Sequence, residues 1–225
     1  GNAADIGAMH DFLVLLRDYL NVNVLHYEYI GYGLAKDQGS PSESNTYESV
    51  EAAYKFLVDD QKVAPNDIVI FGTSVGSGPS CHIASKHPHL KGLILECPFT
   101  SIMRVVSSSV LARPIDMFKN IDKIDQVKFP VLIMHGTEDD VVPFEHGKAL
   151  WEKVPEKYKY EPQWVRNGTH HDIIELLTVK GYITILTTFL KYCQTFVDDR
   201  DKDGLVMEPV SNSSSSWFSF ASPSN

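Results

Sequence analysis

The chain has 225 residues, of which 43% are hydrophobic and 22% charged, and its formal net charge is −9 at pH 7. This length and composition predict one globular domain with a sizeable core. The acidic balance argues against a nucleic-acid partner, because phosphate binding needs a basic face. No uninterrupted apolar run reaches the roughly 18 residues of a membrane-spanning helix, and we recognise no signal peptide.

Helical and strand patterns alternate along the chain. Helical spacing of apolar residues predicts helices over 3–20, 46–61, 75–87, 145–153 and 172–196. Short apolar runs predict strands over 22–33 (ending in a glycine turn), 66–72, 91–99, 129–136 and 161–168. The alternation predicts an α/β fold with a mostly parallel sheet and helices on both faces. In such sheets ligands bind at the carboxyl ends of the strands.

The composition changes near the C-terminus. Residues 199–225 are acidic and then Ser-rich, which predicts a disordered tail after a domain over 1–198. The stretch "DRDKDG" (199–204) resembles the start of a calcium loop, but its twelfth position is Val210 where a glutamate is needed. Cys81, Cys97 and Cys193 are far apart and odd in number, so we expect free thiols, with neither a disulfide framework nor a zinc site.

A candidate nucleophile lies in the sequence "GTSVG" (72–76), directly after a predicted strand and before a predicted helix. Between a strand and a helix, the pattern G-x-S-x-G indicates a nucleophilic serine, because the tight turn exposes the hydroxyl of Ser74 at the edge of the sheet. We expect the glycines on either side to relieve crowding in that turn. The alternative is a glycine-rich turn that happens to hold a serine.

A nucleophilic serine needs a base and an acid that orients the base. Asp139 and Asp140 follow the strand that ends at 136, and His170 and His171 follow the last predicted strand. An imidazole suits the base because it titrates near neutral pH. The order Ser, Asp, His, each after a strand, is that of α/β-hydrolases. For the oxyanion hole we expect the backbone N–H of Val75 and, from the loop before the first helix, that of Asn2, with Ala3 second.

Several stretches together resemble the α/β-hydrolase-domain-17 group, which are serine hydrolases that remove palmitate from protein cysteines. These stretches are "GNAADIG", "YEYIGYG", "SPSESNTYESVEAA", "GTSVGSGPS", "NIDKID", "VLIMHGTEDDVVPFEHG" and "NGTHHDI", and they span about residues 1–196. The wider relatives are the Bem46-like and serine aminopeptidase-like hydrolases. The resemblance implies Ser74 as nucleophile, Asp139 as acid and His170 as base, in preference to Asp140 and His171.

The chain departs from the family pattern at several places. Glu28 replaces an aspartate and His171 replaces an asparagine. The family's lipidated cysteine-rich segment does not precede "GNA" here, so membrane anchoring is not carried over to this chain. The family also has a histidine and a strand before "GNA". We therefore expect N-terminal strands to be missing, and these 225 residues alone to be a poor enzyme. Beside the Ser74 strand we expect the sheet either to have a gap or to close up with its neighbours.

The expected function is hydrolysis of acyl thioesters or esters on proteins or small molecules through a Ser-His-Asp triad, without metal or organic cofactor. The resemblance implies that the acyl group is palmitate on protein cysteines. The alternatives are a small-ester carboxylesterase, an aminopeptidase-like amidase, or a non-catalytic binding module. Residues 98–117 are the expected cap, with Ile102, Met103 and Val106 as candidate acyl-chain contacts that could equally pack on the core. The sequon "NGT" (167–169) abuts His170, and a glycan there would obstruct the site. We expect a cytoplasmic location, with the full-length parent at the cytosolic face of a membrane as the resemblance implies.

Overall fold

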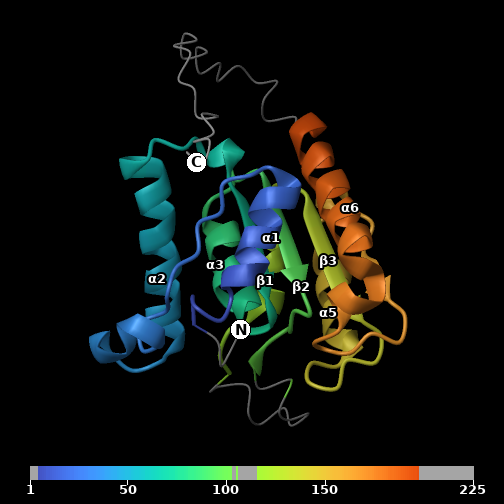
Figure 1. Cartoon of the computed structure of the whole chain (residues 1–225), viewed down its shortest axis with the longest axis horizontal. Helices are drawn as coiled ribbons and strands as arrows, with labels where there is room; N and C mark the ends of the chain where they lie inside the picture. Colours follow the sequence, from blue (N-terminus) through green and yellow to red (C-terminus); the bar gives the residue numbers. More distant parts are fainter. Residues whose placement is uncertain (1–4, 103–104, 106–115, 198–225) are drawn as a thin grey trace, which may run out of the picture. The chain divides into compact units, whose positions relative to one another are not determined.

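A computed structural model of the chain describes residues 5–102, 105 and 116–197. Its sheet has four parallel strands in the order β1-β2-β3-β4, which also follow one another in the sequence (Figure 1). The strands are β1 (Val69–Thr73), β2 (Gly92–Glu96), β3 (Val131–Gly136) and β4 (Gln163–Val165). All residues of β2 and β3 are buried, as expected for continuous apolar strands covered on both faces.

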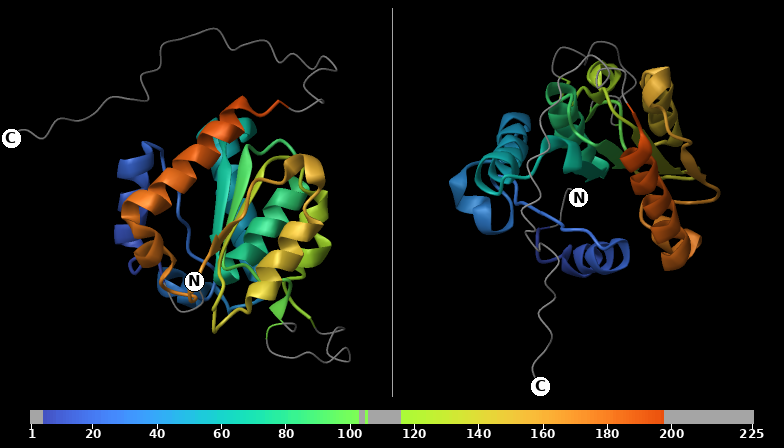
Figure 2. Two further views of the ribbon diagram at one scale, coloured as in Figure 1. Left: turned by 90° about the vertical axis from the view of Figure 1, so that its right-hand side faces the viewer. Right: turned by 90° about the horizontal axis from the view of Figure 1, so that it is seen from above.

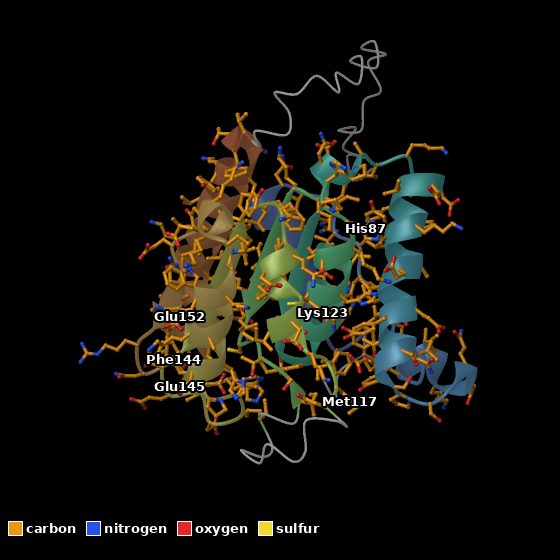
Figure 3. All side chains as sticks on the ribbon, turned by 180° about the vertical axis from the view of Figure 1, so that it is seen from behind. His87, Met117, Lys123, Phe144, Glu145 and Glu152 are labelled. Atoms are coloured by element: carbon orange, nitrogen blue, oxygen red, sulfur yellow. The ribbon has the colours of Figure 1, made fainter. Side chains whose placement is uncertain are left out.

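Helices cover both faces of the sheet, as predicted. Helices α1 (His10–Leu20) and α6 (Ile173–Thr195) pack together on one face, and α3 (Ser77–Lys86) and α5 (Phe144–Lys153) lie on the other (Figure 2). Helix α2 (Glu43–Lys55) packs against α3. Figure 3 shows the second face from behind, with Phe144 and Glu152 labelled on α5. Short helical segments complete the chain at Gly33–Gln38, Phe56–Asp60, Pro65–Asp67, Ser74–Gly76, Asn120–Asp122, Ile124–Gln126 and Glu156–Tyr158.

The main core lies between the sheet and the helices α1 and α6. Its buried members include Leu132 and Met134 of β3, together with Tyr182, Leu186 and Phe189 of α6. Cys97 and Cys193 also belong to it, and all three cysteines are free and buried. This core fixes the carboxyl ends of the strands, from which the site is built.

Several predicted elements differ from the structure, among them the helix expected over 3–20, which begins at His10. Residues 22–33 contain no strand, and Gly33–Gln38 is a short 3-10 helix. Helix α2 begins at Glu43 because Ser42 caps it, accepting a hydrogen bond from the backbone N–H of Asn45 at 3.1 Å. The predicted helix over 172–196 is broken at Thr178, whose φ of 59° is not helical. There the Thr178 hydroxyl accepts from the N–H of Gly181 at 3.3 Å and so caps the second part.

Helix α6 is longer and more apolar than the sequence analysis expected of any segment in this chain. An 18-residue window of it has a mean hydropathy of 1.6, so α6 is long and apolar enough to cross a membrane by length and composition. A helix that covers a sheet passes the same test. In this fold α6 contributes Tyr182, Phe189 and Cys193 to the core, with none of them more than 1% exposed.

The expected gap beside the Ser74 strand is confirmed. Among the described residues, β1 forms one edge of the sheet, and the extended segment 22–29 does not pair with it. A cavity of about 380 Å³ lies between them. Its walls include Val24 and Tyr27 of the segment, Val69 and Phe71 of β1, and Leu16 of α1.

The chain divides into two units, residues 1–195 and 196–225. The predicted tail, with its resemblance to a calcium loop, lies outside the described residues. The domain limits proposed from the sequence therefore stay predictions.

Candidate active site

Ser74 occupies a strained turn between β1 and α3. Its φ is 52°, in the left-handed region that residues with a side chain rarely adopt. The segment Ser74–Gly76 forms a single 3-10 turn, and the N–H of Ser77 then donates to the carbonyls of Ser74 and Val75. The turn brings the serine hydroxyl to the carboxyl end of the sheet.

The two glycines of the turn are not equivalent. A Cβ on Gly72 would lie 2.3 Å from Oγ of Ser80 and 2.6 Å from the carbonyl oxygen of Gly76, so no side chain fits there. A Cβ on Gly76 would meet only the hydroxyl of Tyr29, at an ordinary 3.7 Å. The expectation that both glycines relieve crowding therefore holds for Gly72 and is wrong for Gly76.

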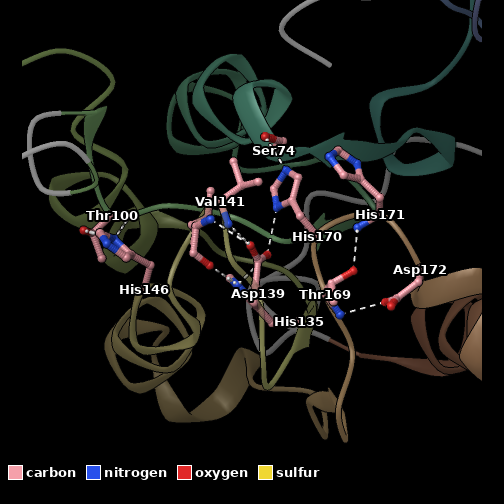
Figure 4. A network of polar contacts seen from close by, with 11 residues as sticks. Ser74, Thr100, His135, Asp139, Val141, His146, Thr169, His170, His171 and Asp172 are labelled. Carbon is pink, nitrogen blue, oxygen red and sulfur yellow. Dashed lines mark hydrogen bonds and ion pairs between the residues drawn. The ribbon is translucent and has the colours of Figure 1, made fainter.

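Ser74, His170 and Asp139 form one hydrogen-bonded chain (Figure 4). His170 Nε2 lies 3.0 Å from Oγ of Ser74, and His170 Nδ1 lies 2.8 Å from Oδ2 of Asp139. These contacts join residues that are 96 and 31 positions apart in the sequence. The neighbouring candidates Asp140 and His171 are exposed and do not take these places.

The carboxylate of Asp139 is fixed by its own loop. Its Oδ1 accepts hydrogen bonds from the backbone N–H groups of Val141 and Val142, at 2.9 and 2.7 Å. Burial by itself raises the pKa of Asp139, but hydrogen bonds from His135, His170, Val142 and Val141 outweigh burial and hold that pKa well below its usual value. Asp139 is therefore an ionised acceptor beneath His170.

The loop that carries His170 is tied to the loop that carries Asp139. The N–H of Glu138 donates to the carbonyl of Gly168 at 2.8 Å. A Cβ on Gly136 would lie 2.2 Å from that same carbonyl oxygen, so the close approach of the two loops requires glycine at the end of β3. The carboxylate of Asp172 accepts from the N–H of Thr169 at 2.7 Å and orders the turn before His170.

Some predicted site residues lie elsewhere or outside the description. Asn2, Ala3, Met103 and Val106 are not among the described residues. The side chains of Val75 and Ile102 pack against a small buried cluster of Phe99, Phe118 and Val142. The packing of Ile102 corresponds to the core alternative considered for the cap.

Two buried polar residues near the site were not among those predicted from the sequence. His135 of β3 is fully buried behind Asp139, and Glu96 ends β2 opposite Thr73 of β1. Burial raises the pKa of Glu96, although the hydroxyl of Tyr182 donates to it at 2.7 Å. A charged residue at the end of the apolar run "LILE" (93–96), and a histidine inside "VLIMHG" (131–136), were the available signals.

Cys97, His135 and Asp139 have potential metal-ligand atoms within 4.8 Å of one another. Both oxygens of Asp139 accept N–H groups, and burial raises the pKa of the Cys97 thiol. A protonated thiol and a carboxylate already engaged by His170 suit the hydrogen-bonded chain better than a metal ion.

Comparisons with known proteins show the family of the chain. Residues 41–176 match the model of the prolyl oligopeptidase family. The chain is 40% identical over 174 residues to human alpha/beta hydrolase domain-containing protein 17B, an alignment that covers 77% of the chain and 59% of the relative. It is 37% identical over 189 residues to an alpha/beta hydrolase of Acanthamoeba polyphaga mimivirus, covering 84% of the chain and 71% of the relative.

Solved structures share the fold at low sequence identity. A monoacylglycerol lipase of Paleococcus ferrophilus superposes with a TM-score of 0.63 at 16% identity, covering 85% of this chain and 91% of the other. A serine hydrolase of Cycloclasticus zankles superposes with a TM-score of 0.64 at 15% identity, covering 87% and 88%. The present chain spans about 60% of the length of human protein 17B. The sheet, the site geometry and these matches establish that the chain belongs to the α/β-hydrolase family, among relatives of the alpha/beta hydrolase domain-containing 17 proteins.

Proposed function

We propose that this chain is the hydrolase domain of an enzyme that cleaves acyl thioesters and esters with Ser74, His170 and Asp139. The observation that supports the proposal is the hydrogen-bonded chain from Asp139 through His170 to the hydroxyl of Ser74. A serine becomes nucleophilic when a base removes its proton as it attacks, and here only His170 contacts the hydroxyl among the described residues.

The proposed reaction has two halves. The Ser74 oxygen attacks the acyl carbon while His170 Nε2 takes the hydroxyl proton, and the oxyanion is stabilised by the N–H groups of Val75 and Asn2. The bond from carbon to sulfur or oxygen then breaks, and His170 gives its proton to the leaving group. Water attacks the acyl-enzyme in the same way, with His170 as base, and releases the acid and free Ser74. Asp139 holds the imidazole with Nδ1 protonated and stabilises its charged form.

We further propose that the acyl group is palmitate on a protein cysteine, as the resemblance to the domain-17 group implies. The segment 98–117 would contribute the acyl-binding wall, with Met103 and Val106. Ile102 packs on the buried cluster of Phe99, Phe118 and Val142 instead. We propose a cytosolic location, with the full-length parent at the membrane surface. Asn167 of the sequon is exposed and three residues from His170, so a glycan there would interfere with the site.

The first experiment is a chain-length series of acyl thioesters and esters. Because of the cavity beside β1, we expect slow turnover by these 225 residues, so the acyl-enzyme is also read as a mass increase on intact protein. Ser74→Ala is the blank. Ser85→Ala is the matched control, because the Ser85 hydroxyl lies on the far part of α3 and donates only to its own helix. A long-chain thioester preference that Ser74→Ala abolishes is the expected result.

Other outcomes select the alternatives. Acylation by short esters alone would indicate a carboxylesterase, and turnover of aminoacyl amides would indicate an aminopeptidase-like enzyme. A mass increase that is equal in Ser74→Ala and in the parent chain would contradict the assigned nucleophile and favour a binding module.

A further inference from the structure

His135 lies directly behind the acid of the site. Its side chain is fully buried, and its Nε2 lies 2.9 Å from the carbonyl oxygen of Val142 and 3.2 Å from Oδ2 of Asp139 (Figure 4). A carbonyl oxygen can only accept a hydrogen bond, so Nε2 must carry the proton. That N–H therefore points at both the Asp139 loop and the carboxylate itself.

Protonation of the other ring nitrogen of His135, Nδ1, is energetically unfavourable. Nδ1 is buried and has no hydrogen-bond partner in the described part of the chain. It faces Gly147 of α5 so closely that a Cβ there would lie only 2.4 Å away. Protonating Nδ1 would bury an unpaired, charged N–H against a helix, which is costly. The geometry keeps His135 a neutral imidazole that donates through Nε2.

We propose that His135 is a positioning residue that acts on His170 through Asp139. The carboxylate oxygen Oδ1 is held by two backbone N–H groups, so the turn keeps Asp139 in place without help. Oδ2 is shared, because His135 and His170 both donate to it. The Nε2–H of His135 takes up part of the charge of Oδ2 and limits how strongly Asp139 stabilises protonated His170. This keeps the base of the site unprotonated over a wider pH range, a role that rests on the proposed function.

Other ionisable groups surround the pair and stay constant in the test. Glu96 and Cys97 approach from the end of β2. The ring of His171 lies 4.9 Å from that of His170, and Asp172 closes the turn before it. The Cys97 thiol also makes a hydrogen bond with Asp139. Cys97 is unchanged in both variants, so a change confined to His135 isolates the contribution of the imidazole.

The test follows the protonation of His170 by NMR in the parent chain and in two variants. His135→Leu removes the donor, whereas His135→Gln keeps an N–H at the place of Nε2. We expect the titration midpoint of His170 to rise by about half to one pH unit in His135→Leu and to return to the parent value in His135→Gln. The His170 signal is the one that His170→Gln removes.

A matched control and a measurement on the parent chain complete the test. His87→Leu removes a histidine at the far end of α3, where Figure 3 labels it, and should leave the midpoint unchanged. In the parent chain, ¹⁵N shifts should show the His135 proton on Nε2. A midpoint that stays or falls in His135→Leu, equal effects of Leu and Gln, or a His135 proton on Nδ1 would each overturn the proposal.

The NMR titration needs no substrate. If no acyl compound is turned over but the His170 midpoint still rises in His135→Leu, the proposed reaction fails and the coupling stands. If acyl turnover is seen and the midpoint does not move, the reaction stands and the role of His135 fails.

Discussion

The hydroxyl of Tyr182 on α6 donates a 2.7 Å hydrogen bond to Oε2 of Glu96 at the end of β2. Both side chains are buried, with Tyr182 0% and Glu96 8% exposed. The contact ties α6 to the sheet next to the site. It also leaves a carboxyl group buried with one strong donor and, at 3.5 Å, the hydroxyl of Thr73.

Glu96→Gln should make the protein more stable at neutral pH. Burial raises the pKa of Glu96 above its ordinary 4.5, so the folded state holds a proton that the unfolded chain releases. The free energy of unfolding therefore falls as pH rises from about 4.5 through the raised value. A neutral glutamine still accepts from Tyr182 and avoids this loss. In urea unfolding from pH 4 to 8, the free energy of unfolding of Glu96→Gln should increase relative to that of the parent chain as pH rises. A difference between the two that does not change with pH would contradict this.

Ser74→Gly should be more stable than Ser74→Ala. Both changes remove the hydroxyl, but only glycine adopts the φ of 52° without strain. We expect a difference of about 1 kcal/mol in the free energy of unfolding, with both variants inactive. Paired chemical denaturation measures it. An alanine variant as stable as the glycine variant would show that the turn stores no strain.

Gly72→Ala and Gly76→Ala should differ sharply. A Cβ on Gly72 would collide with Ser80 and with the backbone of Gly76, so we expect a loss of about 1–3 kcal/mol in stability and a displaced nucleophile. Gly76 has helical φ and room for a methyl group, so its alanine variant should stay within about 0.5 kcal/mol. Thermal unfolding and acylation of Ser74 provide the two readings. Equal losses would mean that the turn moves on substitution.

Asp139→Asn should lower kcat by a factor of about 10³–10⁴, because an amide cannot stabilise protonated His170. Asp140→Asn is the matched control, since Asp140 is exposed and Asp139 is the residue in contact with His170. We expect the control to keep the parent rate with the best acyl substrate of the series. A larger loss in Asp140→Asn would reverse the choice between the two acids.

The hydrogen-bonded carboxylate of Asp139 also predicts how the stability of the protein depends on pH. The pKa of Asp139 is held below its ordinary 3.8, so its contribution to stability is present above that value and is lost as pH falls through the lower folded value. Asp139→Asn should therefore destabilise the protein at pH 7 and approach the parent below about pH 4. The measurement is the free energy of unfolding of Asp139→Asn and of the parent chain over this pH range. A difference between them that does not change with pH would contradict the ionised, hydrogen-bonded state of Asp139.

The amino-acid sequence by itself located the four strands along the chain and the strand ends that the site residues follow. Buried parallel strands are continuous apolar runs, and that signal is local, so β1 to β4 could be located from "DIVIF" to "QWV". The pattern around Ser74, Asp139 and His170 could be read because each stands at a strand end, where parallel sheets place their ligands.

Tertiary structure alone decided the rest. The segment 22–33 has strand-forming residues, but a strand exists only when another strand pairs with it, and here a cavity separates it from β1. Residue types alone left His170 and His171 both open, and only the family resemblance implied His170. The contact of His170 with Ser74 itself depends on loops 31 to 96 residues apart. The second donor on Asp139 came from His135, a residue that in the sequence is only one more member of an apolar strand. Its role depends on which atoms lie around it in the folded core, and no local pattern records that.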